Sequence, residues 1–346
     1  MNHSNKKPPL GLVLLCIVVL GILLFFVTDG KLDLNSMSKT RGAPTDKEEN
    51  MAYNDLFRSV SNNTLERDGI ILRADGNELL FYALAGKAAT SDGSELKEDL
   101  LYTLTSIAER SDRDIEQISE YMGYFYMYDG EDVYRIHTTN SELKLTIDNC
   151  TKFEPMGNYL YSIKDRDGEF WLHRCMVTGA DEEYMFRESF VDFWAHSGDL
   201  LLKRPDGSYM WYDVVTENSY DRSLPSDASG ICLYESTVYF LHSEEDETYL
   251  YQSPCFSNDW DKFIEEPVAD YCIAEGYCAY FAPDKSGTKL MCLNLETGQT
   301  TEYSGMHFDE DSTVDVSKNN IFITDSQNRI WYSPLNKDNW KEIFVD

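Results

Sequence analysis

The sequence has little positive charge. Of its 346 residues, 30 are Lys or Arg and 61 are Asp or Glu, which gives a formal net charge of −31. Proteins that bind nucleic acid or anionic lipid surfaces neutralise phosphates with Lys and Arg, so a chain this acidic would be repelled. We therefore exclude nucleic acid as a partner. We interpret the acidity as surface charge that favours solubility, with cation binding as the alternative.

The chain also lacks the short motifs of several enzyme classes. Its six histidines are never spaced as His-x-x-x-His, Gly-x-Ser-x-Gly is absent, and no phosphate-cradling Gly-rich run precedes a Lys. These absences argue against a helical zinc site, a hydrolase nucleophile elbow and a nucleotide phosphate loop. We therefore predict that the protein is not an enzyme, and we name no catalytic residue, no cofactor-binding residue and no cofactor.

No charged or strongly polar side chain interrupts residues 10–27. At 1.5 Å per residue, this run is long enough to cross a hydrocarbon core of about 30 Å. A cleaved signal peptide would have a shorter apolar run that ends in small residues, whereas Thr28-Asp29-Gly30-Lys31 comes next here. We predict an uncleaved transmembrane helix in contact with membrane lipid. Residues 1–9 would form a cytoplasmic tail, and the large acidic remainder would lie outside the cell membrane.

Residues 28–61 have the composition of a linker, because Ser, Thr, Lys, Asp, Glu and Gly dominate as far as about residue 50. Residues 51–60 have the spacing of a short amphipathic helix that leads into the next domain. Residues 62–346 are then expected to form one ectodomain.

This ectodomain repeats weakly. Each unit contains a short strand, a turn that often holds Gly, two aromatic strands separated by an Asp, Asn or Gly turn, and a polar return strand. After Gly123 the units begin at Gly157, Gly198, Ser236, Gly276 and Asn319. The spacing of about forty residues is that of a four-stranded propeller blade. We predict an all-β protein with a β-propeller of seven blades, with six blades as the alternative. A pair of β-sandwiches, which has no forty-residue period, is the rival architecture.

One landmark recurs two repeats apart. Ser253-Pro254 with Trp260 returns 80 residues later as Ser333-Pro334 with Trp340. Residues 85–97, rich in Gly, Ser and Ala, are expected to form an exposed insertion in the first unit.

One unit carries a family signature. Phe322, Ile323, Thr324 and Asp325, followed by Ile330, are similar to the YWTD signature, and the other units keep an aromatic strand and an Asp-containing turn. Over about residues 62–346 the chain resembles the β-propellers related to the YWTD repeats of lipoprotein receptors, in the form found in bacterial membrane-anchored proteins of unknown function. The resemblance implies a binding or scaffolding domain and carries over no catalytic residue. The receptor propellers have six blades.

Two functions are compatible with these patterns. We predict an extracytoplasmic module that binds a protein or an envelope polymer. The alternative is an enzyme that acts on cell-envelope polysaccharide, because carboxylates are paired at Asp165 and Asp167, at Glu244–Glu247 and at Asp309–Asp311. Residues 309–311 also offer oxygen ligands to Ca²⁺, but they lack the spacing of a known calcium loop, so the metal prediction stays open. The aromatic strands could present a sugar- or peptide-binding face, although we favour packing between blades.

The predicted ectodomain contains an odd number of cysteines. They are Cys150, Cys175, Cys232, Cys255, Cys272, Cys278 and Cys292. At least one must therefore be free or form an intermolecular bond. Cys272 and Cys278 flank Glu275-Gly276 and could face each other across a hairpin as a disulfide. The alternative is that these cysteines are small buried hydrophobic residues.

Overall fold

The computed structural model describes residues 64–67, 70–76, 78–83, 113–137, 143–285, 287–309 and 311–343. All regular elements within these ranges are β-strands. In this part of the chain, no helix suited to crossing a membrane is present. The predicted tail, anchor, linker and short helix before residue 62, and the insertion at 85–97, lie outside the described residues.

The strands form antiparallel sheets whose members follow one another in chain order. The first sheet has three strands: β1 (Thr64–Arg67), β2 (Ile70–Asp75) and β3 (Glu78–Ala83). The next three sheets have four strands each: β4 (Gln117–Tyr121), β5 (Tyr124–Tyr128), β6 (Val133–His137) and β7 (Leu143–Ile147); β8 (Cys150–Met156), β9 (Tyr159–Arg166), β10 (Glu169–Met176) and β11 (Glu183–Ser189); β12 (Asp192–His196), β13 (Asp199–Lys203), β14 (Tyr209–Asp213) and β15 (Ser219–Arg222).

The C-terminal half continues the same pattern. Three more four-stranded sheets consist of β16 (Ser229–Tyr234), β17 (Thr237–Glu244), β18 (Glu247–Pro254) and β19 (Asp261–Lys262); β20 (Asp270–Ala274), β21 (Tyr277–Asp284), β22 (Gly287–Asn294) and β23 (Thr300–Phe308); β24 (Thr313–Val316), β25 (Asn320–Thr324), β26 (Ile330–Pro334) and β27 (Lys341–Ile343).

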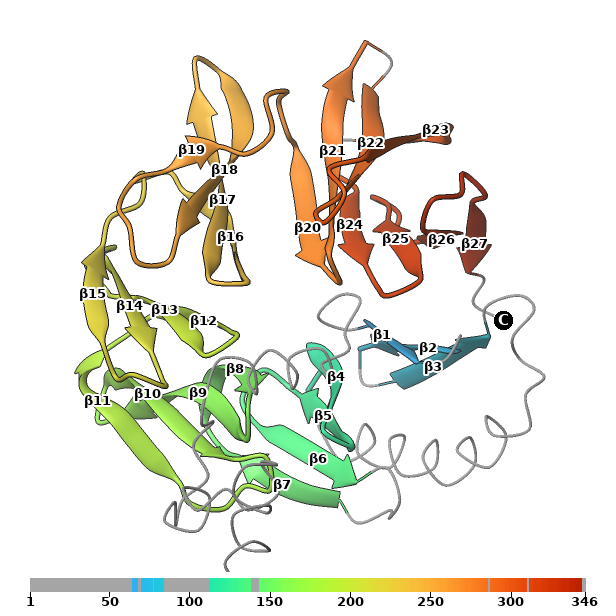
Figure 1. Ribbon diagram of the computed structural model, residues 1–346. Helices are drawn as coiled ribbons and strands as arrows, with labels where there is room; N and C mark the ends of the chain where they lie inside the picture. Colours follow the sequence, from blue (N-terminus) through green and yellow to red (C-terminus); the bar gives the residue numbers. More distant parts are fainter. Residues whose placement is uncertain are drawn as a thin grey trace, which may run out of the picture. The chain divides into compact units, whose positions relative to one another are not determined.

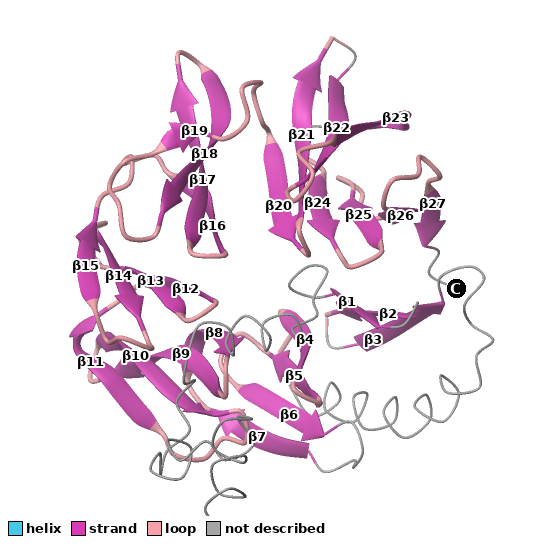
Figure 2. Ribbon diagram, in the orientation of Figure 1, coloured by secondary structure: helices cyan, strands magenta, loops and turns pink. Residues whose placement is uncertain are grey.

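The four-stranded sheets are the blades of a β-propeller, each with its first strand innermost (Figures 1 and 2). The first strands of successive sheets contact one another, as β8 does with β12, β12 with β16, β16 with β20, and β20 with β24. The all-β propeller is thereby confirmed, and the sandwich pair is excluded. Six four-stranded blades are present in the described part of the chain. The prediction of seven blades is not supported, because sheet β1–β3 has three strands among the described residues.

The tight turns between strands follow from the local sequence. Arg166 pairs with Glu169, so Asp167-Gly168 is a two-residue hairpin loop, and both of its residues have positive φ (58° and 87°). Positive φ at both positions defines the type I′ turn that suits the twist of a hairpin, and Asp-Gly is among its favoured pairs. The glycines that begin the predicted repeats, such as Gly276, lie in the turn between the first and second strands of a blade. The predicted period is therefore confirmed, and each blade begins one strand before its glycine.

Adjacent blades are tied by the last residue of the first strand. The Tyr121 hydroxyl donates to the carbonyl oxygen of Gly157 (2.8 Å), and the amide of Glu235 donates to Nδ1 of His196 (3.2 Å). The amide of Gly276 donates to the Tyr234 hydroxyl (3.0 Å). Each contact joins one blade to the first turn of the next. Because the same position recurs, these side chains set how successive blades pack.

The three-stranded sheet packs against both the first and the last four-stranded blade. Leu65 and Leu72 belong to a buried cluster with residues of β4, β5 and β6, whereas Ile71 packs with Phe322, Ile330 and Tyr332 of β25 and β26. The Glu66 carboxylate accepts hydrogen bonds from Ser317 Oγ and from Nδ2 of Asn320. Sheet β1–β3 therefore joins the two ends of the series of blades through side-chain contacts.

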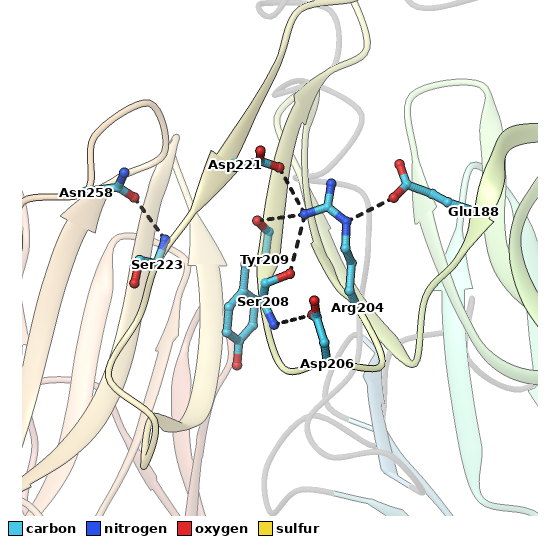
Figure 3. A network of polar contacts seen from close by, with 8 residues as sticks. All are labelled: Glu188, Arg204, Asp206, Ser208, Tyr209, Asp221, Ser223 and Asn258. Atoms are coloured by element: carbon cyan, nitrogen blue, oxygen red, sulfur yellow. Dashed lines mark hydrogen bonds and ion pairs between the residues drawn. The ribbon is translucent and has the colours of Figure 1, made fainter.

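An arginine also connects the outer strands of two blades (Figure 3). Nε of Arg204 donates to Glu188 of β11 (2.9 Å), and its Nη1 donates to Asp221 of β15 (3.0 Å). On the other side of β15, the amide of Ser223 donates to Oδ1 of Asn258 (2.9 Å). Strand β15 is thus held from both sides, toward blade β8–β11 and toward blade β16–β19.

Candidate functional site

The carboxylates of the polysaccharide-enzyme hypothesis lie in turns. Asp165 Oδ1 accepts the amide of Gly168 (2.8 Å), and Asp167 occupies the hairpin loop itself. Glu244 accepts hydrogen bonds from the Tyr251 hydroxyl and from Nζ of Lys262 (3.0 Å). These contacts give both groups a structural role within their own blades.

The third acidic group is engaged by a serine of its own loop and by a serine of the turn after β25. Asp309 accepts hydrogen bonds from Oγ of Ser312 (2.8 Å) and of Ser326 (2.5 Å), while Asp311 is exposed and Glu310 lies outside the described residues. Across the ranges that the structure describes, no group of three or more His, Cys, Asp and Glu side chains is placed to hold a metal ion.

One arrangement has the composition of a catalytic triad. Oγ of Ser162 lies 3.0 Å from Nδ1 of His173, and Nε2 of His173 lies 3.6 Å from Oε2 of Glu182. Ser162 and His173 are buried, so no substrate can reach the hydroxyl. Burial, reinforced by the nearby Lys164 charge, lowers the pKa of His173 to about 4 and keeps the ring neutral. The group is therefore a buried polar contact between strands β9 and β10.

The seven cysteines within the described residues are free thiols, so the suggested disulfide between Cys272 and Cys278 is wrong. Cys272 pairs with Ala279 and Ile273 pairs with Cys278 across the hairpin β20–β21. Neighbouring positions on a strand point to opposite faces of the sheet, so the two thiols face different blades. The alternative interpretation, that these cysteines are small hydrophobic residues, agrees with their burial; the buried ones are Cys150, Cys175, Cys255, Cys278 and Cys292.

Native thiols are expected to react far more slowly than unfolded ones. Burial raises the pKa of the Cys150, Cys175 and Cys292 thiols to about 12, which removes the reactive thiolate near neutral pH. In a chromogenic disulfide-exchange assay at pH 8, these thiols should react at least about a hundredfold more slowly in buffer than in urea. Rapid labelling of Cys278 or Cys292 in the folded protein, located by mass spectrometry, would contradict their burial.

Charged side chains on the first strands β8 and β12 pair with one another. Nζ of Lys152 lies 3.1 Å from Glu154 and 3.0 Å from Asp192, and it lies 4.8 Å from the centre of the Trp194 ring. The second oxygen of Glu154 accepts the amide of Ala195 (2.7 Å). Burial raises the pKa of Glu154 despite the Lys152 charge. Because each charge here has a partner, the arrangement serves to join the two blades.

A second carboxyl pair lies on β20 and β24. Oδ2 of Asp270 accepts the amide of Val314 (3.1 Å), next to Asp315. Burial, followed by the charge of Asp270, raises the pKa of Asp315 to about 8. Burial also raises the pKa of Asp270, against the effect of its backbone hydrogen bonds. We therefore expect Asp315 to keep its proton at neutral pH.

The large apolar side chains that are exposed do not lie on the first strands of the blades, where the charged pairs lie. Seven are exposed in the described residues: Leu145, Phe170, Tyr184, Val191, Tyr220, Phe256 and Trp260. Tyr220, Phe256 and Trp260 lie along the junction of blades β12–β15 and β16–β19. We refer to these three residues as the aromatic seam.

Two of the seam residues, Tyr220 and Trp260, pack on the same buried cluster. The cluster lies between the two blades and contains Trp211, Phe240, Tyr251 and Cys255. Tyr220 stacks on Trp211 with ring centres 5.3 Å apart, and Trp260 meets Tyr251 edge-on at 5.2 Å. Phe256 follows Cys255 in the chain. The seam is therefore the exposed margin of a rigid aromatic core.

Polar contacts fix the two sides of the seam. The buried Arg222 donates from Nη1 to the carbonyl oxygen of Pro254 (2.7 Å) and from Nη2 to Oγ of Ser253 (2.9 Å). Tyr220 and Arg222 are two residues apart on β15, so both side chains point to the same face, toward residues 253–258. This places Tyr220 on the side of β15 that carries Phe256.

Only part of this surface was indicated by the sequence. Trp260 belongs to the repeated Ser-Pro and Trp landmark, and both tryptophans precede the last strand of their blades. Trp340 packs edge-on against Phe308 at 5.2 Å, whereas Trp260 is 38% exposed. No sequence pattern distinguished the exposed copy from the covered one, and Tyr220 and Phe256 were not anticipated.

Comparison with known proteins supports the fold. No family model matches the chain, and no curated protein matches it. Among solved structures, PorZ, a bacterial surface component of the type-IX secretion system of Porphyromonas gingivalis, superposes with a TM-score of 0.52 at 11% identity. The match covers 84% of this chain but only 39% of PorZ. The N-terminal domain of Nup159 and Saccharomyces cerevisiae Sqt1 each give a TM-score of 0.47, at 9% and 7% identity, with 84% of this chain covered and 92% and 88% of theirs. At these identities the likeness concerns the fold alone.

Proposed function

We propose that this protein is a membrane-anchored propeller that binds a protein partner and acts as a binding or scaffolding module outside the cell membrane. The observation that supports the proposal most directly is the aromatic seam. Aromatic side chains that are exposed but rigidly supported are typical of the centres of protein interfaces. Propellers also present such surfaces at fixed positions, because each blade is locked to the next.

The proposed location rests on the apolar run at 10–27 and on the acidic composition of the remainder of the chain. PorZ, whose fold is similar, is a bacterial surface component, and this agrees with an external propeller. Digestion of intact cells with an added protease should remove the propeller and spare a tag placed before residue 10. Protection of both ends of the chain would contradict the external location.

Binding is tested by affinity capture of the full-length protein from solubilised envelopes after crosslinking. We expect a defined partner that is absent when only residues 1–61 are used as bait. Recovery of nothing above that control, while a known membrane complex is recovered in parallel, would contradict the proposed function. An envelope polymer as the partner would appear as co-purifying carbohydrate. In the described residues, no observation specifically favours the polysaccharide-cleaving alternative, since Asp165 and Asp167 build a turn.

A further inference from the structure

We propose that the aromatic seam binds a basic segment of a protein partner, one that carries an apolar or aromatic side chain between positive charges. The inference rests on the proposed function and adds to it the place and the chemistry of the contact. It is drawn from exposure, from packing and from the sign of the surrounding charge.

The seam residues are exposed, and two of them, Tyr220 and Trp260, are held by ring contacts. Phe256 is 68% exposed and Tyr220 is 53% exposed, the largest and third largest values among exposed large hydrophobic residues in the described ranges. Tyr220 is held by Trp211 and Trp260 by Tyr251, so these rings would lose little freedom when a partner covers them. Aromatic residues fixed in this way are frequent anchors of binding energy.

The exposed charges beside the seam are negative. Asp259 and Asp261 flank Trp260 in the chain, and both are exposed. The neighbouring cations are engaged within the protein. Arg222 is buried against the Pro254 carbonyl, and Nζ of Lys262 pairs with Glu244 at 3.0 Å.

The negative charge beside the seam favours a positively charged partner. An acidic segment would meet the like charges of Asp259 and Asp261, and like charges across an interface cost affinity. A basic segment would gain both the local attraction and the long-range field of a chain with a net charge of −31. Apolar contact with Phe256 and Tyr220 would then hold it in one register.

The test uses the full-length protein in detergent and three fluorescent peptides as probes. The first is Lys-Lys-Leu-Trp-Leu-Lys-Lys; the second has Glu in place of each Lys; the third has Ser in place of Leu and Trp. We expect anisotropy to report binding of the first peptide alone, weakened by salt because exposed charges are screened. Phe256→Ser should weaken that binding at least about tenfold.

Leu145→Ser is the matched control. Leu145 is 55% exposed on β7, away from the seam, so its replacement removes a similar apolar surface elsewhere. We expect Leu145→Ser to leave the affinity for the peptide unchanged. Both variants should have the melting temperature of the wild-type protein, since neither side chain is buried.

Three results would overturn the inference. The first is equal affinity of the Phe256→Ser and Leu145→Ser variants for the basic peptide, which would indicate diffuse binding to an acidic surface. The second is equal binding of the Glu-containing peptide. The third is capture of the cellular partner equally well by wild type and Phe256→Ser, which would leave the proposed function in place and remove the seam from it. Failure of the proposed function itself is distinct, since neither protein would then capture a partner.

Discussion

Replacing Phe240 with Ala is expected to lower the free energy of unfolding by about 3–5 kcal/mol. Phe240 lies on β17 with 0% of its surface exposed, in the cluster between blades β12–β15 and β16–β19. Its ring is stacked on Tyr251 at 5.8 Å and meets Trp260 edge-on at 6.2 Å. Two contributions add up. The folded state loses the free energy of burying the phenyl ring, and a cavity is left between strands that are held by neighbours on both sides.

Phe256→Ala is the matched control for this substitution. It removes the same side chain from the same blade, but from a position 68% exposed, so the change should stay within about 0.5 kcal/mol. Urea unfolding followed by tryptophan fluorescence measures both variants. A loss below about 1 kcal/mol for Phe240→Ala would show that the two blades do not pack as described.

The parts of the fold that depend on neighbouring residues in the chain were predictable. Asp167-Gly168 forms the hairpin loop expected of an Asp-Gly pair, because both residues tolerate positive φ. The repeated serines are equally local: Ser253 Oγ donates to the carbonyl of Asp259 (2.7 Å), and Ser333 Oγ donates to that of Lys337. Such contacts involve residues a few positions apart, and the sequence pattern therefore carries them.

The sequence-based predictions that were wrong concern contacts that depend on strand register or on segments far apart in the chain. A two-residue loop at Glu275-Gly276 places Cys272 opposite Ala279, so a strict count from the turn would already have separated Cys272 from Cys278. The number of blades depends on how sheet β1–β3 is built and joined to β25 and β26, about 250 residues away, where Glu66 meets Asn320. No local pattern encodes that contact.

The aromatic seam was missed for a related reason. Trp260 and Trp340 occupy equivalent places in their blades, yet Trp340 is covered by Phe308 and Tyr303 of the preceding blade. Exposure of the tryptophan is thus decided by the neighbouring blade, and the neighbour differs between the two copies. A repeat in sequence therefore predicts the position of a side chain in its blade but not whether its surface is available for binding.

Asp315→Asn is expected to stabilise the protein at pH 8 and to remove a decline in stability that wild type shows as pH rises. Burial and the nearby Asp270 raise the pKa of Asp315 to about 8, whereas an unfolded Asp titrates near 3.9. Between these values the folded protein retains a proton that the unfolded chain has released, so the free energy of unfolding falls with rising pH. The decline can reach about 1.4 kcal/mol per pH unit and ends above the folded pKa. Asparagine keeps the shape of the side chain and carries no titrating proton.

Other titrating groups determine the pH range in which the effect of Asp315 on the free energy of unfolding can be observed. Burial lowers the pKa of His173 and His196 to about 4, which adds stability as pH rises toward the ordinary histidine value of about 6.5. The pKa of Glu244 is lowered by the Tyr251 and Lys262 hydrogen bonds, so its contribution is lost only in acid. Above about pH 6.5 the Asp315 contribution is therefore not offset by these groups.

Unfolding should accordingly be compared at several pH values from about 6.5 to 9 for wild type, Asp315→Asn and the control Glu244→Gln. The difference between wild type and Asp315→Asn should widen up to about pH 8 and then stay constant, because both states of wild type are ionised beyond that point. The difference between wild type and Glu244→Gln should not change across the same range. Parallel curves for wild type and Asp315→Asn would mean that Asp315 is already ionised at neutral pH and that burial does not raise its pKa as described.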